Sequence, residues 1–172
     1  YLPPQYLNDQ TNLHTLQANL SNIGTNIGTV TTDIDGDSRP LAPSLTVDIG
    51  ADEYNVPANN IGVTAVVNPV APMTVGLQDV VVQVTNFGTA TVTSANVSYK
   101  VGINGTPKTI AWTGSLATNG ATNVTFTGAN QYNFTGSYDT VIAWTSLPNG
   151  VTDEYLGNDT FTNSVVCQPL SG

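Results

Sequence analysis

From residue 61 onward the chain alternates apolar residues with polar or small ones, and this period of two restricts the fold more than any other feature. Successive side chains of a β-strand point to opposite faces, so the period predicts strands with one buried face and one solvated face. Seven such strands over residues 61–167 predict an immunoglobulin-like β-sandwich. The expected strands lie at 61–67, 80–85, 97–101, 109–112, 124–126, 138–144 and 161–166.

The turn between the third and fourth strands carries the strongest hairpin signal. Asn104-Gly105 tolerates the positive φ angles of a type I′ turn, so we expect a tight hairpin there. The sixth strand has apolar residues on both sides, with Tyr138, Ile142 and Trp144 opposite Val141 and Ala143. We expect a central strand that is buried on both faces, or a strand that contacts a neighbouring domain.

The core of this sandwich has to form without an internal disulfide bond, because Cys167 is the only cysteine. We expect it to rest on Trp112, Phe126, Trp144 and the Val and Ile residues. The two tryptophans could instead form a platform for a sugar, but a strand pattern favours the core interpretation.

An acidic stretch at residues 31–54 ends the N-terminal part of the chain and surrounds the only arginine, Arg39. On an extended segment, Asp33, Asp35 and Asp37 would share one side and repel each other. Arg39 could pair with two of them, and Asp side chains can also accept hydrogen bonds from turn amides. The stretch contains half of the chain's acidic residues: Asp33, Asp35, Asp37, Asp48, Asp52 and Glu53.

The same stretch carries a family resemblance. DIDGDSRP at 33–40, followed by VDIGADEY at 47–54, resembles the closing signature of right-handed parallel β-helix domains in large bacterial secreted proteins. The resemblance implies that residues 1–54 are the final coil and cap of such a β-helix. With residues 55–60 as a linker, the expected fold class is all-β: a β-helix end followed by a seven-stranded immunoglobulin-like sandwich over 61–167.

A calcium site is the alternative interpretation of the acidic stretch. An EF-hand loop is excluded, because its sixth and twelfth positions would hold Ser38 and Ser44 instead of Gly and Glu. An irregular site remains open, and so does a pair of carboxylates for glycoside cleavage, although no aromatic groove is readable beside them. The candidate calcium ligands are Asp33, Asp35, Asp37, Asp48 and Asp52.

A second acidic loop follows the sixth strand and contains Asp153, Glu154, Asn158 and Asp159. We expect a solvated turn there, with a calcium site between domains as the alternative. Neither acidic segment indicates a catalytic residue or a bound cofactor. Because a single histidine lies far from Cys167 in the sequence, a Cys–His catalytic pair is not expected.

Net charge limits the partners. With three Lys and Arg against twelve Asp and Glu, the net charge is −9, which excludes nucleic acids and anionic membranes as partners. No apolar run is long enough for a membrane helix, and no charged-then-apolar signal segment opens the chain. The opening YLPPQYL leads us to expect a piece of a longer polypeptide.

The second part of the chain carries a resemblance of its own. The segments VTNFGT at 84–89, WTGSLA at 112–117, AWTSLPNG at 143–150 and NDT at 158–160 resemble the CARDB family of bacterial cell-adhesion-related domains. The resemblance implies a repeated module of very large surface proteins, often exported by type IX secretion, without catalytic residues. Residues 168–172 would begin a linker or a further repeat, which would supply a disulfide partner for Cys167.

We therefore expect a non-enzymatic structural spacer of a secreted bacterial surface protein, either an adhesin or a filament. Its partners would be neighbouring domains of the same polypeptide, and a surface glycan or another cell-surface protein could join them. The alternative is an accessory, glycan-binding part of a secreted carbohydrate-active β-helix protein. A third expectation is a binding module that calcium makes rigid.

Overall fold

The computed structural model describes residues 6–8, 12–15, 20–41, 44–135 and 138–168. The chain divides into two compact units, Tyr1–Pro57 and Ala58–Gly172, and we describe each by itself. The division falls inside the predicted linker at residues 55–60. Residues 58–60 nevertheless belong to the second unit, because Asn60 O accepts hydrogen bonds from Phe87 N and Gly88 N at 2.9 and 3.0 Å.

Unit 2 is built from β-strands and short 3-10 turns. In chain order its elements are β3 (Ile61–Asn68), β4 (Met73–Thr74), β5 (Gly76–Gln78), β6 (Val80–Asn86), β7 (Val92–Val101), β8 (Lys108–Leu116), β9 (Ala121–Phe126), η1 (Gly128–Asn130), β10 (Tyr132–Phe134), β11 (Tyr138–Ser146), η2 (Pro148–Gly150), η3 (Leu156–Asn158) and β12 (Thr160–Gln168). The seven predicted strands are confirmed as β3, β6, β7, β8, β9, β11 and β12. Strands β4, β5 and β10 are short additions that the alternation did not reveal.

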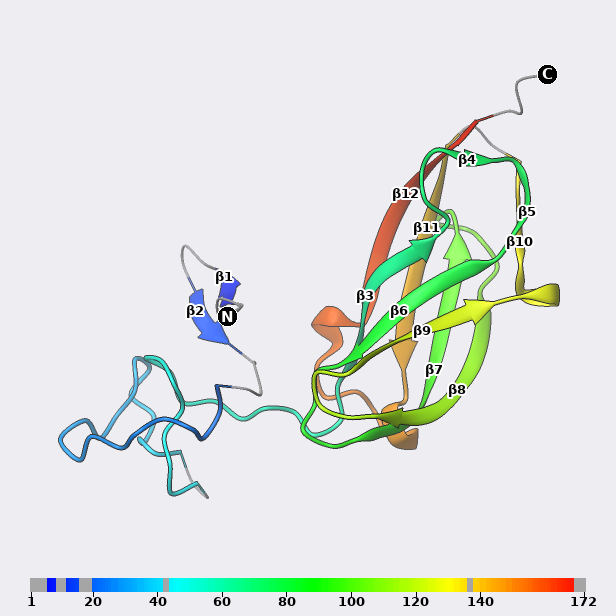
Figure 1. Cartoon of the computed structure of the whole chain (residues 1–172). Helices are drawn as coiled ribbons and strands as arrows, with labels where there is room; N and C mark the ends of the chain where they lie inside the picture. Colours follow the sequence, from blue (N-terminus) through cyan, green and yellow to red (C-terminus); the bar gives the residue numbers. More distant parts are fainter. Residues whose placement is uncertain (1–5, 9–11, 16–19, 42–43, 136–137, 169–172) are drawn as a thin grey trace. The chain divides into compact units, whose positions relative to one another are not determined.

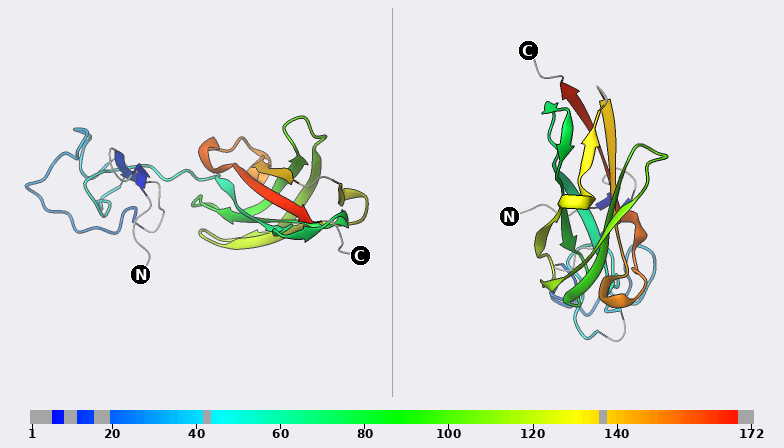
Figure 2. Two further views of the ribbon diagram at one scale, coloured as in Figure 1. Left: turned by 90° about the horizontal axis from the view of Figure 1, so that it is seen from above. Right: turned by 90° about the vertical axis from the view of Figure 1, so that its right-hand side faces the viewer.

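These strands form two facing sheets (Figures 1 and 2). One sheet has the order β3-β6-β9, and the other has the order β4-β12-β11-β7-β8. Neighbouring strands are antiparallel, except that β4 pairs with β12 in parallel. Strands β5 and β10 form a separate antiparallel pair. Together these sheets make the expected sandwich.

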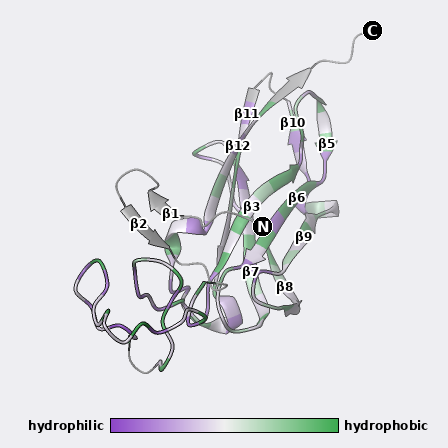
Figure 3. Ribbon diagram, turned by 60° about the vertical axis from the view of Figure 1, so that its left-hand side comes forward, coloured by the Kyte–Doolittle hydropathy of each residue, from purple (hydrophilic) through white to green (hydrophobic). Residues whose placement is uncertain are grey.

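The core lies between the sheets and is built from the inward face of each strand. Val80, Val82 and Val84 of β6 are fully buried, and the residues between them are only partly buried, as a period of two requires. The hydrophobic residues of β3 and β6 are visible as green bands in Figure 3. Tyr99 and Phe126 reach the core from opposite sheets, and their rings meet edge to face with centroids 4.7 Å apart.

One part of the predicted core is wrong. Phe126 is buried as expected, and Trp112 of β8 packs partly against the core. Trp144 is half-buried and lies outside the core cluster, because its neighbours Ala143 and Thr145 take the inward positions of β11. The period of two then sends Trp144 to the outer face of the sheet, so β11 is not fully buried on both faces.

The hairpin between β7 and β8 also differs from the predicted type I′ turn. The positive φ angle belongs to Gly102, at +72°, and neither Asn104 nor Gly105 has one. The loop closes through a hydrogen bond of 3.1 Å from Gly105 N to Gly102 O. The connection therefore has six residues, 102–107, instead of two. Its left-handed position is occupied by Gly102, because glycine has no side chain and adopts a positive φ angle without strain.

Unit 1 contains little regular structure in its described part. Strands β1 (Tyr6–Asn8) and β2 (Asn12–Thr15) pair antiparallel, and two isolated antiparallel bridges join Gly24 to Val47 and Thr32 to Ser38. The described residues contain no parallel ladder, so the β-helix coil over 1–54 stays a prediction. Residues 169–172, in which a further repeat is predicted to begin, lie outside the described residues.

The aromatic contact in the core generates a stability prediction. Replacing Phe126 by Ala leaves a cavity between the sheets, and we expect the free energy of unfolding to fall by about 3–5 kcal/mol. Both tryptophans lie in unit 2, so the urea dependence of tryptophan fluorescence measures this unit alone. Ile103→Ala is the matched control, because Ile103 is 74% exposed and its loss should change the free energy by about 0.5 kcal/mol or less. Equal effects of the two variants would contradict this assignment of the core.

Candidate functional site

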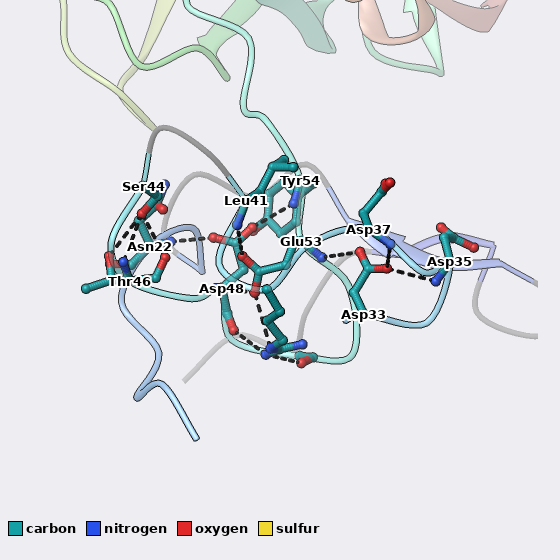
Figure 4. Close-up of polar contacts among 12 residues, drawn as sticks. Asn22, Asp33, Asp35, Asp37, Leu41, Ser44, Thr46, Asp48, Glu53 and Tyr54 are labelled. Atoms are coloured by element: carbon teal, nitrogen blue, oxygen red, sulfur yellow. Dashed lines mark hydrogen bonds and ion pairs between the residues drawn. The ribbon is translucent and has the colours of Figure 1, made fainter. Parts of the chain in front are cut away.

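The acidic stretch of unit 1 begins with a turn that Asp33 organises. Asp33 Oδ1 accepts hydrogen bonds from the amides of Asp35 and Asp37 at 2.9 and 2.8 Å, and Oδ2 accepts one from Glu53 N at 3.1 Å (Figure 4). The segment is thus a turn and not the extended run that would place three carboxylates side by side. Desolvation raises the pKa of Asp33, but the amides of Glu53, Asp37 and Asp35 outweigh it and hold this pKa below its ordinary value.

The ion pair of Arg39 corrects a second expectation. The expected pairing is with two of the three aspartates Asp33, Asp35 and Asp37, whereas the guanidinium group places Nε 3.3 Å from Glu53 Oε1. Its NH2 group donates to two backbone carbonyls, Asp48 O at 2.9 Å and Gly50 O at 2.8 Å. The side chain of the only arginine therefore binds Asp48, Gly50 and Glu53 and cross-links the loop at residues 48–53.

Two buried carboxylates complete this network. Glu53 accepts hydrogen bonds from Asp48 N at 3.0 Å and Leu41 N at 3.1 Å. Asp48 accepts one from Tyr54 N at 2.8 Å and another from Asn22 N (Figure 4). Burial, followed by the charges of Asp48 and Asp52, raises the pKa of Tyr54 above its ordinary value. These carboxylates hold loop backbone, which has no ladder to satisfy its amides.

The predicted calcium ligands are distributed unevenly over this network. Asp48 and Asp52 are buried, Asp33 is half-buried, and Asp35 and Asp37 are exposed. Among the described residues, no group of three or more His, Cys, Asp or Glu side chains is arranged to hold a metal ion. The side chains of Asp33 and Asp48 accept hydrogen bonds from backbone amides, as in the structural interpretation of the stretch. The calcium site in unit 1 stays a prediction.

The second acidic loop lies in unit 2 between β11 and β12, and it is not the solvated turn that the sequence predicts. Asp153 and Asp159 are only 5% and 9% exposed. Asp153 Oδ2 accepts a hydrogen bond from Ile61 N at the start of β3, and Oδ1 accepts one from Tyr155 N, both at 2.9 Å. Asp159 Oδ1 and Asn158 Oδ1 are buried and accept no hydrogen bond.

Burial controls the electrostatics of this loop. Desolvation raises the pKa of Asp153, and desolvation together with the nearby charge of Asp153 raises the pKa of Asp159 to about 6. Glu154 is exposed and accepts hydrogen bonds from Ala58 N at 2.8 Å and from Asn59 N at 3.4 Å. The amide of Ala58 is the main cause that holds the pKa of Glu154 below its ordinary value. The sequence identified these four residues but carried no signal for which of them are buried.

Comparisons with known proteins address the fold of the chain. No protein-family model matches it, and no curated protein matches it. It is similar to the solution structure of a domain of a candidate cell surface protein from Methanosarcina acetivorans, with 22% identity and a TM-score of 0.50 over 64% of this chain and 93% of that one. This likeness supports the sandwich fold.

The crystal structure of a CARDB domain from Pyrococcus furiosus, in complex with di-metal ions, is also similar. It has 23% identity and a TM-score of 0.44 over 67% of this chain and 95% of that one. A solution structure of the same Pyrococcus domain has 24% identity and a TM-score of 0.41, over 64% of this chain and 92% of that one.

Among the described residues, none of the helices has both the length and the apolar character that crossing a membrane requires.

The Glu53 network generates a prediction about unit 1. Glu53→Gln keeps the side-chain shape but removes the charge that holds Arg39, Leu41 N and Asp48 N. A hydrogen bond to a charged group contributes about 1.5–3 kcal/mol, so we expect amide hydrogen exchange in residues 44–54 to accelerate by about tenfold or more. Asp37→Asn makes the same charge change at an exposed side chain and should leave exchange there unchanged. If both variants exchange at the same rate, Glu53 does not organise this loop.

The raised pKa of Asp159 generates a pH prediction. The folded protein binds a proton at Asp159 up to about pH 6, whereas the unfolded chain binds it only near pH 4. Stability should therefore fall as the pH rises through about 4 to 6, and Asp153 acts in the same direction. Asp33 and Glu154 have lowered pKa values, so they make stability depend on pH only below about pH 4.5.

Urea unfolding followed by tryptophan fluorescence in chelator-treated buffer measures this effect. We expect the wild-type chain to be more stable at about pH 5 than at about pH 7, and Asp159→Asn to reduce the difference. A pH dependence of the same size in the variant would assign it to another group.

Proposed function

We propose that this chain is a non-catalytic structural segment of a secreted, cell-surface protein of the adhesin or filament type. The observation that carries the proposal is the use of the carboxylates. In both units several carboxylates bind the backbone amides of loops: Asp33, Asp48 and Glu53 in unit 1, and Asp153 and Glu154 in unit 2. Carboxylates with these contacts stabilise loops, which is a structural role.

The course of the sandwich suits a spacer. Near the end of β11, Thr145 Oγ1 donates to Ile61 O at 2.6 Å and Thr145 N donates to Asp159 O at 3.1 Å. The starts of β3 and β12 therefore lie at the same end of the sandwich, where β11 ends. Both strands run toward the other end, and the chain enters and leaves the sandwich at opposite ends (Figure 1). A nine-residue strand such as β12 spans about 30 Å, which is the spacing that one such module would add between its neighbours.

The exposed aliphatic side chains of unit 1 support the β-helix part of the proposal. The fractional exposure of these residues ranges from 45% to 89%, while Val47 is only 3% exposed. A solenoid coil cannot bury its apolar face alone and needs neighbouring coils. We propose that coils of a right-handed β-helix cover this surface, and that the sandwich is a CARDB-type module exported by a type IX route. The exposed residues are Ile23, Ile27, Val30, Ile34, Leu45 and Ile49.

The rival function is an accessory, glycan-binding part of a secreted carbohydrate-active protein. Its supporting observation is Trp144, which lies half-buried on the outer face of β11 instead of in the core. Trp112 packs partly against the core and contributes less to such a surface. A stacking platform usually needs an aromatic face open to the sugar, so the observations favour the spacer.

Protease treatment of intact cells of the source organism tests the proposal. An antibody against unit 2 should detect a polypeptide longer than 172 residues, and a protease of broad specificity such as proteinase K, added outside the cells, should remove the signal while a cytosolic marker stays intact. A protected signal would contradict surface exposure. The natural polypeptide should also leave polysaccharides uncleaved and should bind a glycan panel no better than its Trp144→Ala variant does. Cleavage, or glycan binding that is lost in Trp144→Ala, would favour the rival.

A further inference from the structure

Two buried carboxylates lie at one end of the sandwich. Asp153 and Asp159 are both more than nine-tenths buried. Asp153 Oδ2 accepts a hydrogen bond from Ile61 N, and Thr145 donates to both Ile61 O and Asp159 O, so both residues lie at the start of β3. Burying a carboxylate is costly unless a cation or several hydrogen bonds compensate it. Asp153 has two backbone amides as partners, but Asp159 Oδ1 has none.

None of the chain's three Lys and Arg residues, all of which the structure describes, pairs with these carboxylates. Lys100 Nζ donates to Ile103 O at 2.7 Å, and Lys108 Nζ donates to Ala129 O and Gln131 O, so both lysines serve the opposite end of β7. Arg39 belongs to unit 1 and pairs with Glu53. Within the described part of the chain, no basic side chain therefore compensates Asp159.

A second oxygen without a partner lies next to the carboxylate. Asn158 Nδ2 donates to Asn60 Oδ1 at 3.0 Å, and this bond orients the amide so that its oxygen is the unpartnered atom. The position of Asn158 is tightly restricted, because a Cβ atom at Gly62 would come within 2.6 Å of Asn158 O. Two consecutive residues, the neutral Asn158 and the acidic Asp159, thus contribute buried oxygens that accept no hydrogen bond, in the same loop as the buried carboxylate of Asp153.

We propose that the β11–β12 loop binds a hard divalent cation of the calcium class through Asp159 Oδ1, Asn158 Oδ1 and the Asp153 carboxylate. Carboxylate and amide oxygens are the ligands that Ca²⁺ prefers, and it accepts irregular geometries with water in the remaining positions. Each Asp153 oxygen keeps a lone pair after binding one amide. Because Asn158 is one of the three proposed ligands, this site differs from a cluster of three His, Cys, Asp or Glu side chains, which is absent among the described residues.

The location gives the cation a structural role. Asp153 binds the first amide of β3, and Glu154 binds the amides of Ala58 and Asn59. The backbone oxygen of Asp159 accepts a hydrogen bond from Thr145 N of β11. A cation in this loop would join the start of the sandwich to the connection between β11 and β12. With only three protein side chains as ligands, we expect an affinity of about 10⁻⁴ to 10⁻³ M, as in extracellular calcium modules.

Thermal unfolding of the whole chain at about pH 7 tests the site, with tryptophan fluorescence as the readout because both tryptophans lie in unit 2. At a calcium concentration about ten times the dissociation constant, the midpoint should rise by about 4–8 °C relative to chelator-treated protein. Magnesium at the same concentration should raise it less, since Mg²⁺ demands octahedral geometry and loses water reluctantly. Calorimetric titration should give one ion per chain.

Asp159→Asn should abolish the calcium-dependent shift and raise the midpoint of the calcium-free protein, because it removes the uncompensated charge. Asp139→Asn is the matched control: Asp139 Oδ2 is also buried and without a partner, but it lies in β11 outside the loop, so the shift should persist. The proposal is overturned if the wild-type chain shows no shift, which would assign compensation of Asp159 to a proton. It is also overturned if the shift survives in Asp159→Asn or is lost in Asp33→Asn, which would place the ion in unit 1.

Discussion

The sandwich depends on burying one face of each of two sheets against the other. Because successive side chains of a strand alternate, every residue that turns inward sends its neighbours outward. This constraint explains features that composition alone does not. The inward positions of β11 belong to Val141, Ala143 and Thr145, so Trp144, the larger hydrophobic residue, takes the outer face. Facing strands, and not the size of a side chain, determine which residues form the core.

The second constraint is the scarcity of positive charge. With three basic residues for twelve acidic ones, few carboxylates can be neutralised by an ion pair. The chain uses backbone amides instead: Asp33, Asp48 and Glu53 organise unit 1, and Asp153 and Glu154 fasten the first residues of unit 2 to the β11–β12 loop. Hydrogen bonds from amides to carboxylates are stronger than those between neutral groups, so irregular segments gain order without regular ladders.

The same scarcity links the proposed cation to the proposed spacer. Asp159, like Asp139, has a buried carboxylate oxygen without a partner, but it lies next to the unpartnered oxygen of Asn158, where the chain enters the sandwich. A module outside the cell would meet calcium at concentrations that suit a weak site. Its stiffness at this end would then depend on the calcium concentration of the medium.

Much of the sandwich could be predicted from the sequence, because the alternation of apolar residues is a local pattern. The alternation located all seven long strands, and Asn, Gly and Pro marked the connections. It could not locate β4, β5 and β10, which are two or three residues long and exist only because a neighbouring strand offers hydrogen bonds. The turn type between β7 and β8 also depended on the pairing register, which placed the left-handed residue at Gly102.

For the two acidic segments too, some properties follow from the sequence and others only from the tertiary structure. The sequence by itself determined which residues are acidic, that they cluster in two segments, and that almost no basic residue is available to pair with them. Only the tertiary structure decided that Arg39 pairs with Glu53, that Asp33 forms a turn, and that Asp153 and Asp159 are buried. The physical reason is that burial and partner choice depend on β3, β11 and β12 meeting at one end of the sandwich. Residues nearly a hundred positions apart, such as Ile61 and Asp153, become neighbours there, and no local pattern records it.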